Sequence, residues 1–585
     1  MQLIKTPIDL SYAKTGSDVL LLGTWCLKKN EDFLAARNVS DIVPYHWDDR
    51  DKYYSDYVYL TGLYEKILLS YSQTLNRIHG VTKDLEYWRV IIGPWLRFCL
   101  DALFDRYECV KVAKSLNNIM ICTVGSYDLN DWYARDFYDF WEDFTSDEWN
   151  EVVFSECIKY QGLAHDIDRH WSIPSNRTSS SSGFEAGSFK GHIKSLLSKC
   201  FSLVSRWKKG TIFIASYATP YKLFKLYCSL RQVPYWLDLR IRTANSSINK
   251  TKRDSLHNAI EQSGFEGFVD NLLPYFIPQS YLEDFSKFKQ RNLNALPNRP
   301  KSLFTASAYQ ADDGFKIWAA EQKKLGVPLI IGQHGGLYGI GKHAQDEDHQ
   351  LLISTTFCSW GWNTCDVSNV KVLPSLQLSA NAIKKPSKDG YILHVLSSYP
   401  RYFYYHVSIP VAGQFLSYLD DQLDFIRQLE QSQKESLKIR LDSSGSSRGW
   451  DASKLLHLKG YSDNIDQSEV RIWKLIQKSR LCVCTTNTTV FLETLSRNFP
   501  TIIFWDPKFF EIRPDAEPFI QRLLDAEILF YNPVDAANKV NMIADNIDEW
   551  WFSEKVQSAR KIFCERYALT SSNWLEEWTK FLFEK

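Results

Sequence analysis

A run of small hydroxyl residues follows one apolar segment of the chain. The apolar residues end at Cys484, and Thr485, Thr486, Asn487 and Thr488 come directly after them, where a helix is expected to begin. Free N–H groups at a helix start, with hydroxyl groups beside them, form a site for an anion such as a phosphate. Each exposed interaction of this kind contributes only about 0.3–1 kcal/mol, so a diphosphate needs several donors together.

Glu493 lies one to two turns into the same expected helix, where its carboxylate can accept hydrogen bonds from ribose hydroxyls. Together with the hydroxyl run, this carboxylate predicts a segment that binds a nucleotide. The alternative is that residues 485–489 only cap the helix and that Glu493 lies on its solvent-exposed face. The spacing alone favours neither interpretation.

A second segment that could carry chemistry is rich in glycine and contains a histidine. Gln333, His334, Gly335 and Gly336 follow a buried strand, and Lys342 comes shortly after. Glycines let a ligand approach the backbone closely, and a histidine at a strand end can deprotonate a hydroxyl, a contribution of about 10²–10⁴-fold. We expect the glutamine and glycines to bind the donor and the histidine to act in catalysis. The alternative is a glycine-rich turn with a structural histidine.

An acidic run with a histidine comes next and consists of Asp346, Glu347, Asp348 and His349. Such residues can coordinate a metal ion or supply a carboxylate base. A run of this kind is more often a solvent-exposed loop. We therefore predict no metal site, and we keep Glu347 as the alternative to His334 as the catalytic base.

Strand ends offer further contacts for phosphate or carboxylate groups. Arg440 lies at the end of one expected strand, and Ser397 and Ser398 follow the strand that contains His394. The planar guanidinium of arginine suits such anions. Each of these residues could equally be an ordinary strand-end residue. We assign Arg440 and Ser398 to donor binding.

Alternating strands and helices must position these residues. Short apolar runs alternate with helical patterns over residues 211–332 and again over 391–531. This alternation is typical of parallel strands joined by crossover helices, with ligands bound at the carboxyl ends of the strands. The sequence therefore predicts an α/β protein with two Rossmann-like lobes that face a cleft. We expect helical additions in the first lobe at 57–77 and 87–106, with a helix start at Pro94.

A polar break at residues 384–390 separates the two alternating stretches. We place the domain boundary there, with an acceptor-side lobe at 1–385 and a lobe that binds the nucleotide donor, with terminal helices, at 386–585. Residues 172–188 are rich in serine and glycine, which predicts an exposed loop or linker.

The composition excludes several classes of protein. The chain has 585 residues, of which 44% are hydrophobic, and 69 basic side chains balance 69 acidic ones. Zero net charge argues against a protein that wraps nucleic acid. The start of the chain does not resemble a signal peptide, and no apolar run is long enough to predict a membrane span. Peripheral association with the inner face of the cytoplasmic membrane stays open.

Twelve cysteines are scattered along the chain, and the close pair is Cys482 and Cys484. Two cysteines one residue apart inside an apolar strand are a poor zinc site. We expect buried thiols in a reducing compartment, and hence a cytoplasmic protein.

Residues 485–504 show the pattern T-x-x-T-x-x-x-x-E-x-L-x-x-x-x-P-x-I-x-F. This pattern resembles the donor-nucleotide segment of GT-B glycosyltransferases. In those enzymes the small residues meet the phosphates and the glutamate often meets the ribose, which implies these roles for residues 485–488 and Glu493. The usual glycine two residues before the proline is Asn498 here.

Other segments resemble a family of transferases from bacterial lipopolysaccharide and surface-glycan loci. They are LGTWC at 22–26, YWR…IGPW at 87–95, QHGGLYG at 333–339 with the acidic run after it, and SWGW at 359–362. This likeness spans most of the chain. The QHG element is also similar to a strand end in teichoic-acid polymerases and capsule transferases, including those that use CMP-activated 3-deoxy-octulosonate.

The resemblances imply a glycosyltransferase that moves a sugar from a CMP-, UDP- or GDP-linked donor to a glycan or lipid-linked acceptor. The pathway would be O-antigen or capsule synthesis, with no tightly bound cofactor. Two alternatives stay open. One is a non-catalytic scaffold that binds nucleotide-sugar or glycan in the same cleft, and the other is a phosphotransferase acting on a CDP-linked polyol.

Overall fold

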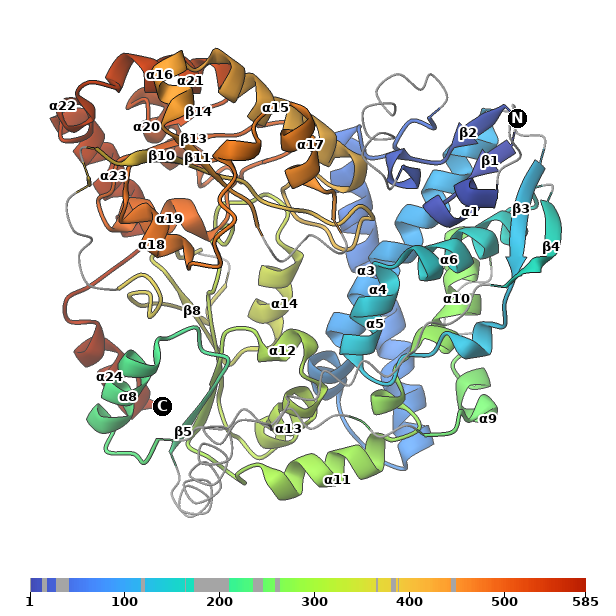
Figure 1. Ribbon diagram of the computed structural model, residues 1–585. Helices are drawn as coiled ribbons and strands as arrows, with labels where there is room; N and C mark the ends of the chain where they lie inside the picture. Colours follow the sequence, from blue (N-terminus) through green and yellow to red (C-terminus); the bar gives the residue numbers. More distant parts are fainter. Residues whose placement is uncertain are drawn as a thin grey trace, which may run out of the picture.

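The structure is a computed structural model. It describes residues 2–12, 18–27, 42–116, 121–163, 165–172, 210–234, 243, 246–257, 263–364, 367–379, 386–387, 389–442 and 449–585. Three parallel sheets organise these residues, two of five strands and one of four (Figure 1). The serine-rich stretch predicted to be a loop lies outside the described residues from 173 onward.

The C-terminal lobe is built on a parallel sheet in the order β11-β10-β12-β13-β14. The strand order reverses between β10 and β12, so a topological switch point, where ligands bind in open α/β sheets, lies between these strands. The strands are mostly buried, as expected for a parallel sheet covered on both faces. They are β10 (Tyr391–Val395), β11 (Leu437–Arg440), β12 (Ser479–Cys484), β13 (Thr501–Phe504) and β14 (Leu529–Phe530).

A second parallel sheet holds five strands that lie side by side in chain order. These strands are β5 (Thr211–Ile214), β6 (Ser302–Thr305), β7 (Leu329–Gly332), β8 (Thr356–Ser359) and β9 (Val370–Val372). Together the two five-stranded sheets confirm the predicted α/β class with two Rossmann-like lobes. The predicted boundary at 385/386 falls between β9 and β10.

A third sheet, which the sequence analysis did not predict, lies near the N-terminus in the order β2-β1-β3-β4. Its strands are β1 (Gln2–Ile4), β2 (Val19–Leu21), β3 (Ile121–Ser126) and β4 (His165–Ser172). Strands of three residues are too short to show a hydrophobic period, which explains why β1 left no clear signal.

Two long helices connect this sheet to the rest of the molecule (Figure 1). Helices α3 (Arg50–His79) and α4 (Leu85–Ser115) have 30 and 31 residues and pack against each other. The expectation that a helix begins at Pro94 is wrong, because α4 continues through that proline. Most of α4 is buried, and a Cβ atom on Gly93 would lie 2.8 Å from the His349 ring, so close packing outweighs the local cost of the proline.

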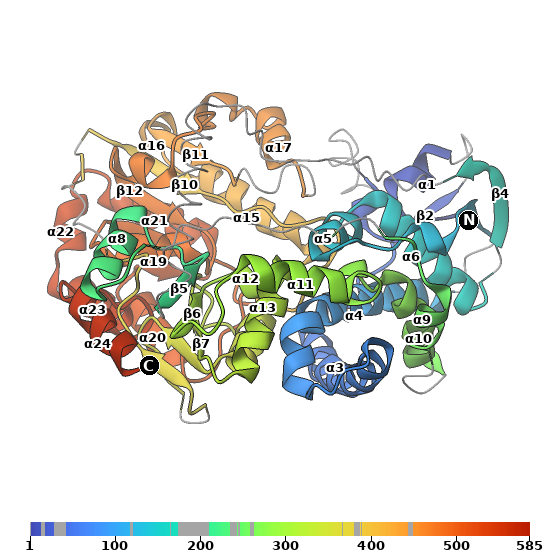
Figure 2. The same cartoon turned by 90° about the horizontal axis from the view of Figure 1, so that it is seen from below.

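The other helices cover the sheets. In the N-terminal part they are α1 (Pro7–Tyr12), α5 (Phe137–Phe144), α6 (Asp147–Tyr160), α8 (Pro220–Ser229), α9 (Lys250–Asp254), α10 (Gly264–Phe276), α11 (Phe285–Ala295), α12 (Ala308–Ala311), α13 (Asp313–Lys324) and α14 (Gln345–Ile353). In the C-terminal part they are α15 (Phe415–Gln428), α16 (Gln431–Glu435), α17 (Ala452–Leu458), α18 (Ile472–Ile476), α19 (Thr489–Ser496), α20 (Glu517–Asp525), α21 (Pro533–Ile543), α22 (Ile547–Trp551), α23 (Glu554–Tyr567) and α24 (Trp574–Glu584). The last helix, α24, returns to pack on α8 of the first lobe (Figure 2).

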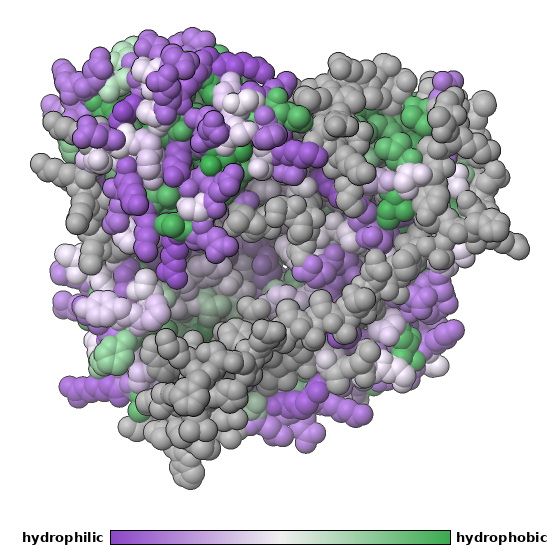
Figure 3. Space-filling view, in the orientation of Figure 1, coloured by the Kyte–Doolittle hydropathy of each residue, from purple (hydrophilic) through white to green (hydrophobic). Residues whose placement is uncertain are grey.

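The surface and the cysteines agree with a globular chain. The face in Figure 3 is mainly hydrophilic over the C-terminal lobe, with hydrophobic side chains in small groups. Within the described ranges, no helix combines the length and the apolar character that crossing a membrane requires. The described cysteines are free thiols and, apart from Cys228, they are buried as predicted.

Candidate active site

A cavity of about 280 Å³ opens at the carboxyl ends of β10, β11 and β12. This is the switch point of the C-terminal sheet, where open α/β sheets bind their ligands. The cavity combines apolar walls with hydroxyl groups, one guanidinium and one carboxylate. Its lining residues are Val395, Leu396, Ser397, Arg440, Leu441, Asp442, Ile472, Cys484, Thr485, Thr486, Thr488 and Val490.

Hydroxyl groups of the predicted run divide into two kinds. The Thr485 hydroxyl is committed within the protein, since it donates to the Val395 carbonyl at 2.9 Å and accepts from the Tyr418 hydroxyl at 2.6 Å. Thr486 and Thr488 pair with each other at 2.8 Å on the cavity wall. Thr485 therefore ties β12 to β10, and the other two hydroxyls remain at the surface that a ligand would meet.

The start of α19 faces the same cavity. Thr488 is the residue before the helix, and its side chain does not cap the helix. The alternative that the threonines serve only as caps is therefore wrong for this residue. Without that cap, the first N–H groups of α19 keep the partial positive charge that attracts an anion.

Arg440 brings a positive charge to the cavity wall at the end of β11. Its Nη1 atom donates to the Asp466 carboxylate at 2.8 Å and to the Ser468 carbonyl. These two bonds hold the guanidinium at the cavity edge, where its other N–H groups can donate to a phosphate.

Three predicted donor-binding residues of the C-terminal lobe do not line the cavity, and neither do Gln333, Gly335 and Gly336 of the first lobe. Ser398 is one: its neighbour Ser397 lines the wall instead, and the Ser398 hydroxyl is buried without a hydrogen-bond partner among the described residues. Asn487 is buried and donates to the Ser408 carbonyl at 3.1 Å. The Glu493 carboxylate accepts from the side-chain amide of Gln377 at 3.2 Å.

The glycine-rich segment of the first lobe contacts the hydroxyl run of the second. A Cβ atom on Gly336 would lie 2.2 Å from the Thr488 carbonyl oxygen, so only glycine fits there. Gln333 fixes this segment: its amide donates to the Gly335 carbonyl at 2.9 Å and accepts from the Trp360 N–H at 2.9 Å and the Trp362 indole at 2.8 Å. The structure thus joins the two predicted segments.

His334 is half-buried and lies two residues before Gly336. Its Nδ1 atom lies 3.1 Å from the Tyr338 hydroxyl, and its ring stacks on Tyr217 with centroids 5.4 Å apart. Burial lowers the pKa of His334 to about 4, so the ring is neutral at pH 7.

Glu347, the predicted alternative base, is 2% exposed and engaged on both oxygens. It accepts from the Gly339 N–H at 2.7 Å and from Arg513 at 2.9 Å. Burial raises the pKa of this carboxyl group, while Arg513 opposes the shift. In this arrangement Glu347 fixes the histidine segment to the C-terminal lobe.

The acidic run is not a loop, because it forms the first turn of α14, which packs on α4. Asp346 accepts from the Gln310 amide at 3.2 Å, and Asp348 accepts from Tyr57. Burial raises the pKa of Asp346 to about 6. These carboxylates already have partners from the protein.

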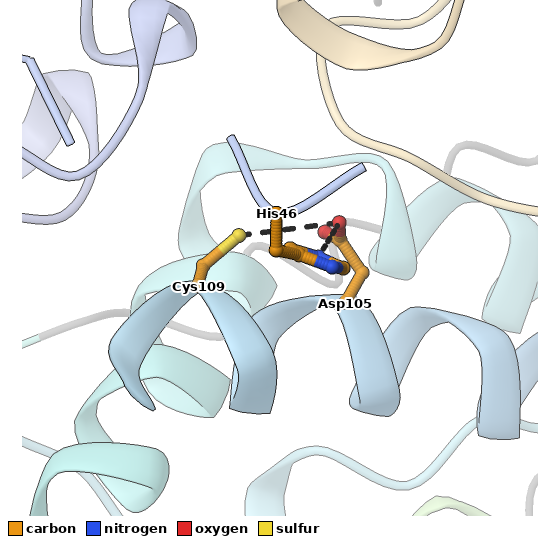
Figure 4. Close-up of side chains that lie close together, drawn as sticks. All are labelled: His46, Asp105 and Cys109. Atoms are coloured by element: carbon orange, nitrogen blue, oxygen red, sulfur yellow. Dashed lines mark hydrogen bonds and ion pairs between the residues drawn. The ribbon is translucent and has the colours of Figure 1, made fainter. Parts of the chain in front are cut away.

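The described residues that could hold a metal ion are elsewhere: His46, Asp105 and Cys109 (Figure 4). Their ligand atoms lie within 4.8 Å of one another and all three residues are buried. Asp105, however, already accepts from Tyr45 at 2.7 Å and from Arg106 at 2.9 Å. Burial also raises the pKa of the Cys109 thiol well above its usual range, which disfavours the thiolate that a metal needs. The geometry fits a buried hydrogen-bond cluster better than a metal centre.

Sequence reasoning missed the residues that support the site from a distance. Tyr418 on α15 bridges the Thr485 hydroxyl and the Ser397 N–H, and Arg513 pairs with Glu347. Tyr338 holds His334. Tyr338 lies inside the glycine-rich segment, so the sequence offered it as a candidate. Tyr418 and Arg513 come from other elements and leave no local signal.

Comparison with known families gives one match that covers nearly the whole chain. The model of a family described as "LIC12162 family transferase" matches residues 1–582. No curated protein matches the chain in sequence.

Solved structures give distant matches. MurG of Acinetobacter baumannii is 11% identical over 68% of this chain and 96% of its own, with a TM-score of 0.32. MnaA of S. aureus with UDP is 10% identical over 63% of this chain and 94% of its own, with a TM-score of 0.34. WaaG, a glycosyltransferase involved in lipopolysaccharide biosynthesis, is 10% identical over 64% of this chain and 100% of its own, with a TM-score of 0.29.

Proposed function

The chain belongs to the LIC12162 family of transferases, and we propose that it transfers a sugar from a nucleotide-activated donor to a glycan or lipid-linked acceptor. The observation that carries this proposal is the cavity at the switch point between β10 and β12. It combines an uncapped helix start, two hydroxyl groups and an arginine, which is the set of groups that a diphosphate needs.

In this proposal the phosphates of the donor meet the first N–H groups of α19 and the hydroxyls of Thr486 and Thr488, with Arg440 at one side. The apolar side chains of Ile472 and Val490 supply a wall for the nucleoside. Leaving-group charge would be stabilised by these fixed dipoles and the guanidinium. Thr485 holds β10 and β12 in register and acts on the donor indirectly.

The first lobe supplies the other side of the site. His334 would act there as the base or as a phosphate partner, beside Gly335 and Gly336, which leave room for the ligand. Glu347 and Gln333 would position this segment. Glu493 remains a proposed ribose ligand only if its carboxylate gives up the hydrogen bond from Gln377.

The acceptor and pathway rest on sequence resemblance. We propose bacterial surface polysaccharide, either O-antigen or capsule, and donors linked to CMP, UDP or GDP. A cytoplasmic protein at the inner face of the membrane would have access to such a donor and to a lipid-linked acceptor.

A thermal-shift panel with CMP, CDP, UDP, GDP and their sugar conjugates tests the proposal. A ligand at about 100 times its dissociation constant adds roughly 2.7 kcal/mol of stability, which is an easily measured shift. We expect one nucleotide to stabilise the wild type and a Thr251→Val control on α9, but not Thr486→Val. No shift with any nucleotide would contradict the proposal and favour a scaffold that binds glycan.

A further inference from the structure

The ring of His334 is held so that its two nitrogens have different surroundings. Nδ1 lies 3.1 Å from the Tyr338 hydroxyl, and the ring face stacks on Tyr217 with an interplanar angle of 24°. Within the described residues Nε2 has no hydrogen-bond partner, and it is not among the buried atoms that lack one, so it opens to solvent. Nε2 is therefore the atom available to a ligand.

A buried network leads from Nδ1 to a carboxylate. The Gln350 side-chain amide donates to the Tyr338 hydroxyl at 2.5 Å and to the Tyr309 hydroxyl at 2.6 Å. The Tyr309 hydroxyl in turn lies beside the Asp346 carboxylate and the Tyr338 hydroxyl. Tyr309, Tyr338 and Gln350 are at most 7% exposed, so water does not compete freely for these bonds.

Counting protons fixes the direction of the bonds around Tyr338. An ionised carboxylate can only accept, so the one proton of Tyr309 points to Asp346 or to the Tyr338 oxygen, and in both cases the Tyr309 oxygen accepts from Gln350. This requirement orients the amide, whose nitrogen then also donates to Tyr338. The Tyr338 proton is left for the Nδ1 atom of His334, and Nδ1 must accept it. In the neutral ring, the remaining proton is then on Nε2.

We propose that this network holds His334 in the tautomer with the proton on Nε2, which makes it a hydrogen-bond donor to an anionic group of the nucleotide-sugar and not the base. The anion's identity rests on the proposed function. The position is suitable, because Gly336, two residues away, contacts the Thr488 carbonyl beside the start of α19. Tyr338, Gln350 and Tyr309 are then positioning residues.

The state of the ring supports this role. Burial lowers the pKa of His334 to about 4, so the imidazole stays neutral at pH 7 and has one N–H. Burial also raises the pKa of Asp346 to about 6, so this carboxylate is ionised at pH 7, as the direction of the network requires.

Nitrogen NMR of the full-length protein labelled with ¹⁵N-histidine measures the tautomer without any ligand. The signal of His334 is the one that disappears in His334→Gln. At pH 7.5 we expect a proton on Nε2 and none on Nδ1 in the wild type and in the control Tyr567→Phe, which removes a buried hydroxyl on α23. In Tyr338→Phe we expect a smaller population of the tautomer with the proton on Nε2. A proton on Nδ1 in the wild type would overturn the inference.

The affinities for CMP, CDP, UDP and GDP, compared between wild type and His334 variants, measure the role of the Nε2 proton. A glutamine side chain places an N–H₂ group close to the position of Nε2, so His334→Gln should keep the affinity within about threefold. His334→Ala should weaken binding about tenfold or more, as expected for loss of a hydrogen bond to a charged group.

The outcomes separate this inference from the proposed function. If Thr486→Val weakens nucleotide binding but His334→Ala does not, the donor role of His334 is overturned and the donor pocket stands. If none of the four nucleotides binds the wild type, the proposed function and the donor role fail together, while NMR still decides the tautomer.

Discussion

Gly336 lies directly on the backbone of Thr488, so that a Cβ atom on the glycine would be 2.2 Å from the threonine's carbonyl oxygen. The two residues belong to different lobes and are 152 positions apart in the sequence, as the numbers 336 and 488 give. This contact joins the segment that contains His334 to the start of α19, where the proposed donor cavity lies. The candidate site is therefore formed by both lobes.

Replacing Gly336 by alanine should separate these two segments. The added methyl group cannot fit against backbone atoms, so we expect a loss of about 1–3 kcal/mol in the free energy of unfolding and weaker nucleotide binding. The control is Gly62→Ala in α3, where nothing lies within 4 Å of the new methyl group and helix propensity favours alanine. Equal stability of the two variants would show that the contact is not tight.

The hydroxyl run allows stability and binding to be separated. Thr485→Val removes buried hydrogen bonds to Tyr418 and to the Val395 carbonyl, and should cost about 1–3 kcal/mol of stability. Thr486→Val should leave stability nearly unchanged and weaken nucleotide binding. Urea unfolding and titration calorimetry measure the two quantities, and the reverse pattern would contradict the assigned roles.

Local sequence was sufficient to place the strands that carry the site. The apolar runs before Thr485 and Gln333 are strands β12 and β7, and the hydroxyl run precedes a helix as predicted. These features are local, because a buried strand and a helix start each leave a pattern within a few residues.

Other features depend on contacts that a single sequence does not show. Local rules place a helix boundary at Pro94, but burial of α4 on most sides overrides them. The charge of the acidic run predicts an exposed loop, yet the run begins a helix that packs on α4, and Glu347 is buried while Asp348 stays exposed. The pairing of Glu347 with Arg513 spans the two lobes, and no spacing predicts it.

The ion pair between Glu347 and Arg513 should show an asymmetric response to mutation. Arg513→Ala leaves a carboxylate that is 2% exposed without its partner, and should cost about 3–5 kcal/mol. Glu347→Gln leaves an arginine that is 19% exposed and can reach water, so its cost should be smaller. Urea unfolding of both variants shows which one loses more stability. A larger loss in Glu347→Gln would contradict the structure.

His394 should make the protein sensitive to acid. Burial lowers its pKa to about 4, compared with about 6.5 in the unfolded chain. As the pH falls below 6.5, His394 binds a proton in the unfolded chain but stays neutral in the folded protein. The wild type therefore loses stability relative to His394→Gln. The difference should change by about 1.4 kcal/mol per pH unit, reaching about 3 kcal/mol near pH 4, and stay constant above pH 6.5. A difference independent of pH would show that His394 titrates normally.

Hydrogen–deuterium exchange tests the central claim, that the nucleotide binds at the carboxyl ends of β10, β11 and β12. The measurement compares the free protein with the protein saturated by the nucleotide that stabilises it. We predict slower exchange in residues 395–398, 440–442 and 484–491, together with 333–337 of the first lobe, which contact this region through Gly336. Protection elsewhere, with these segments unchanged, would contradict the account.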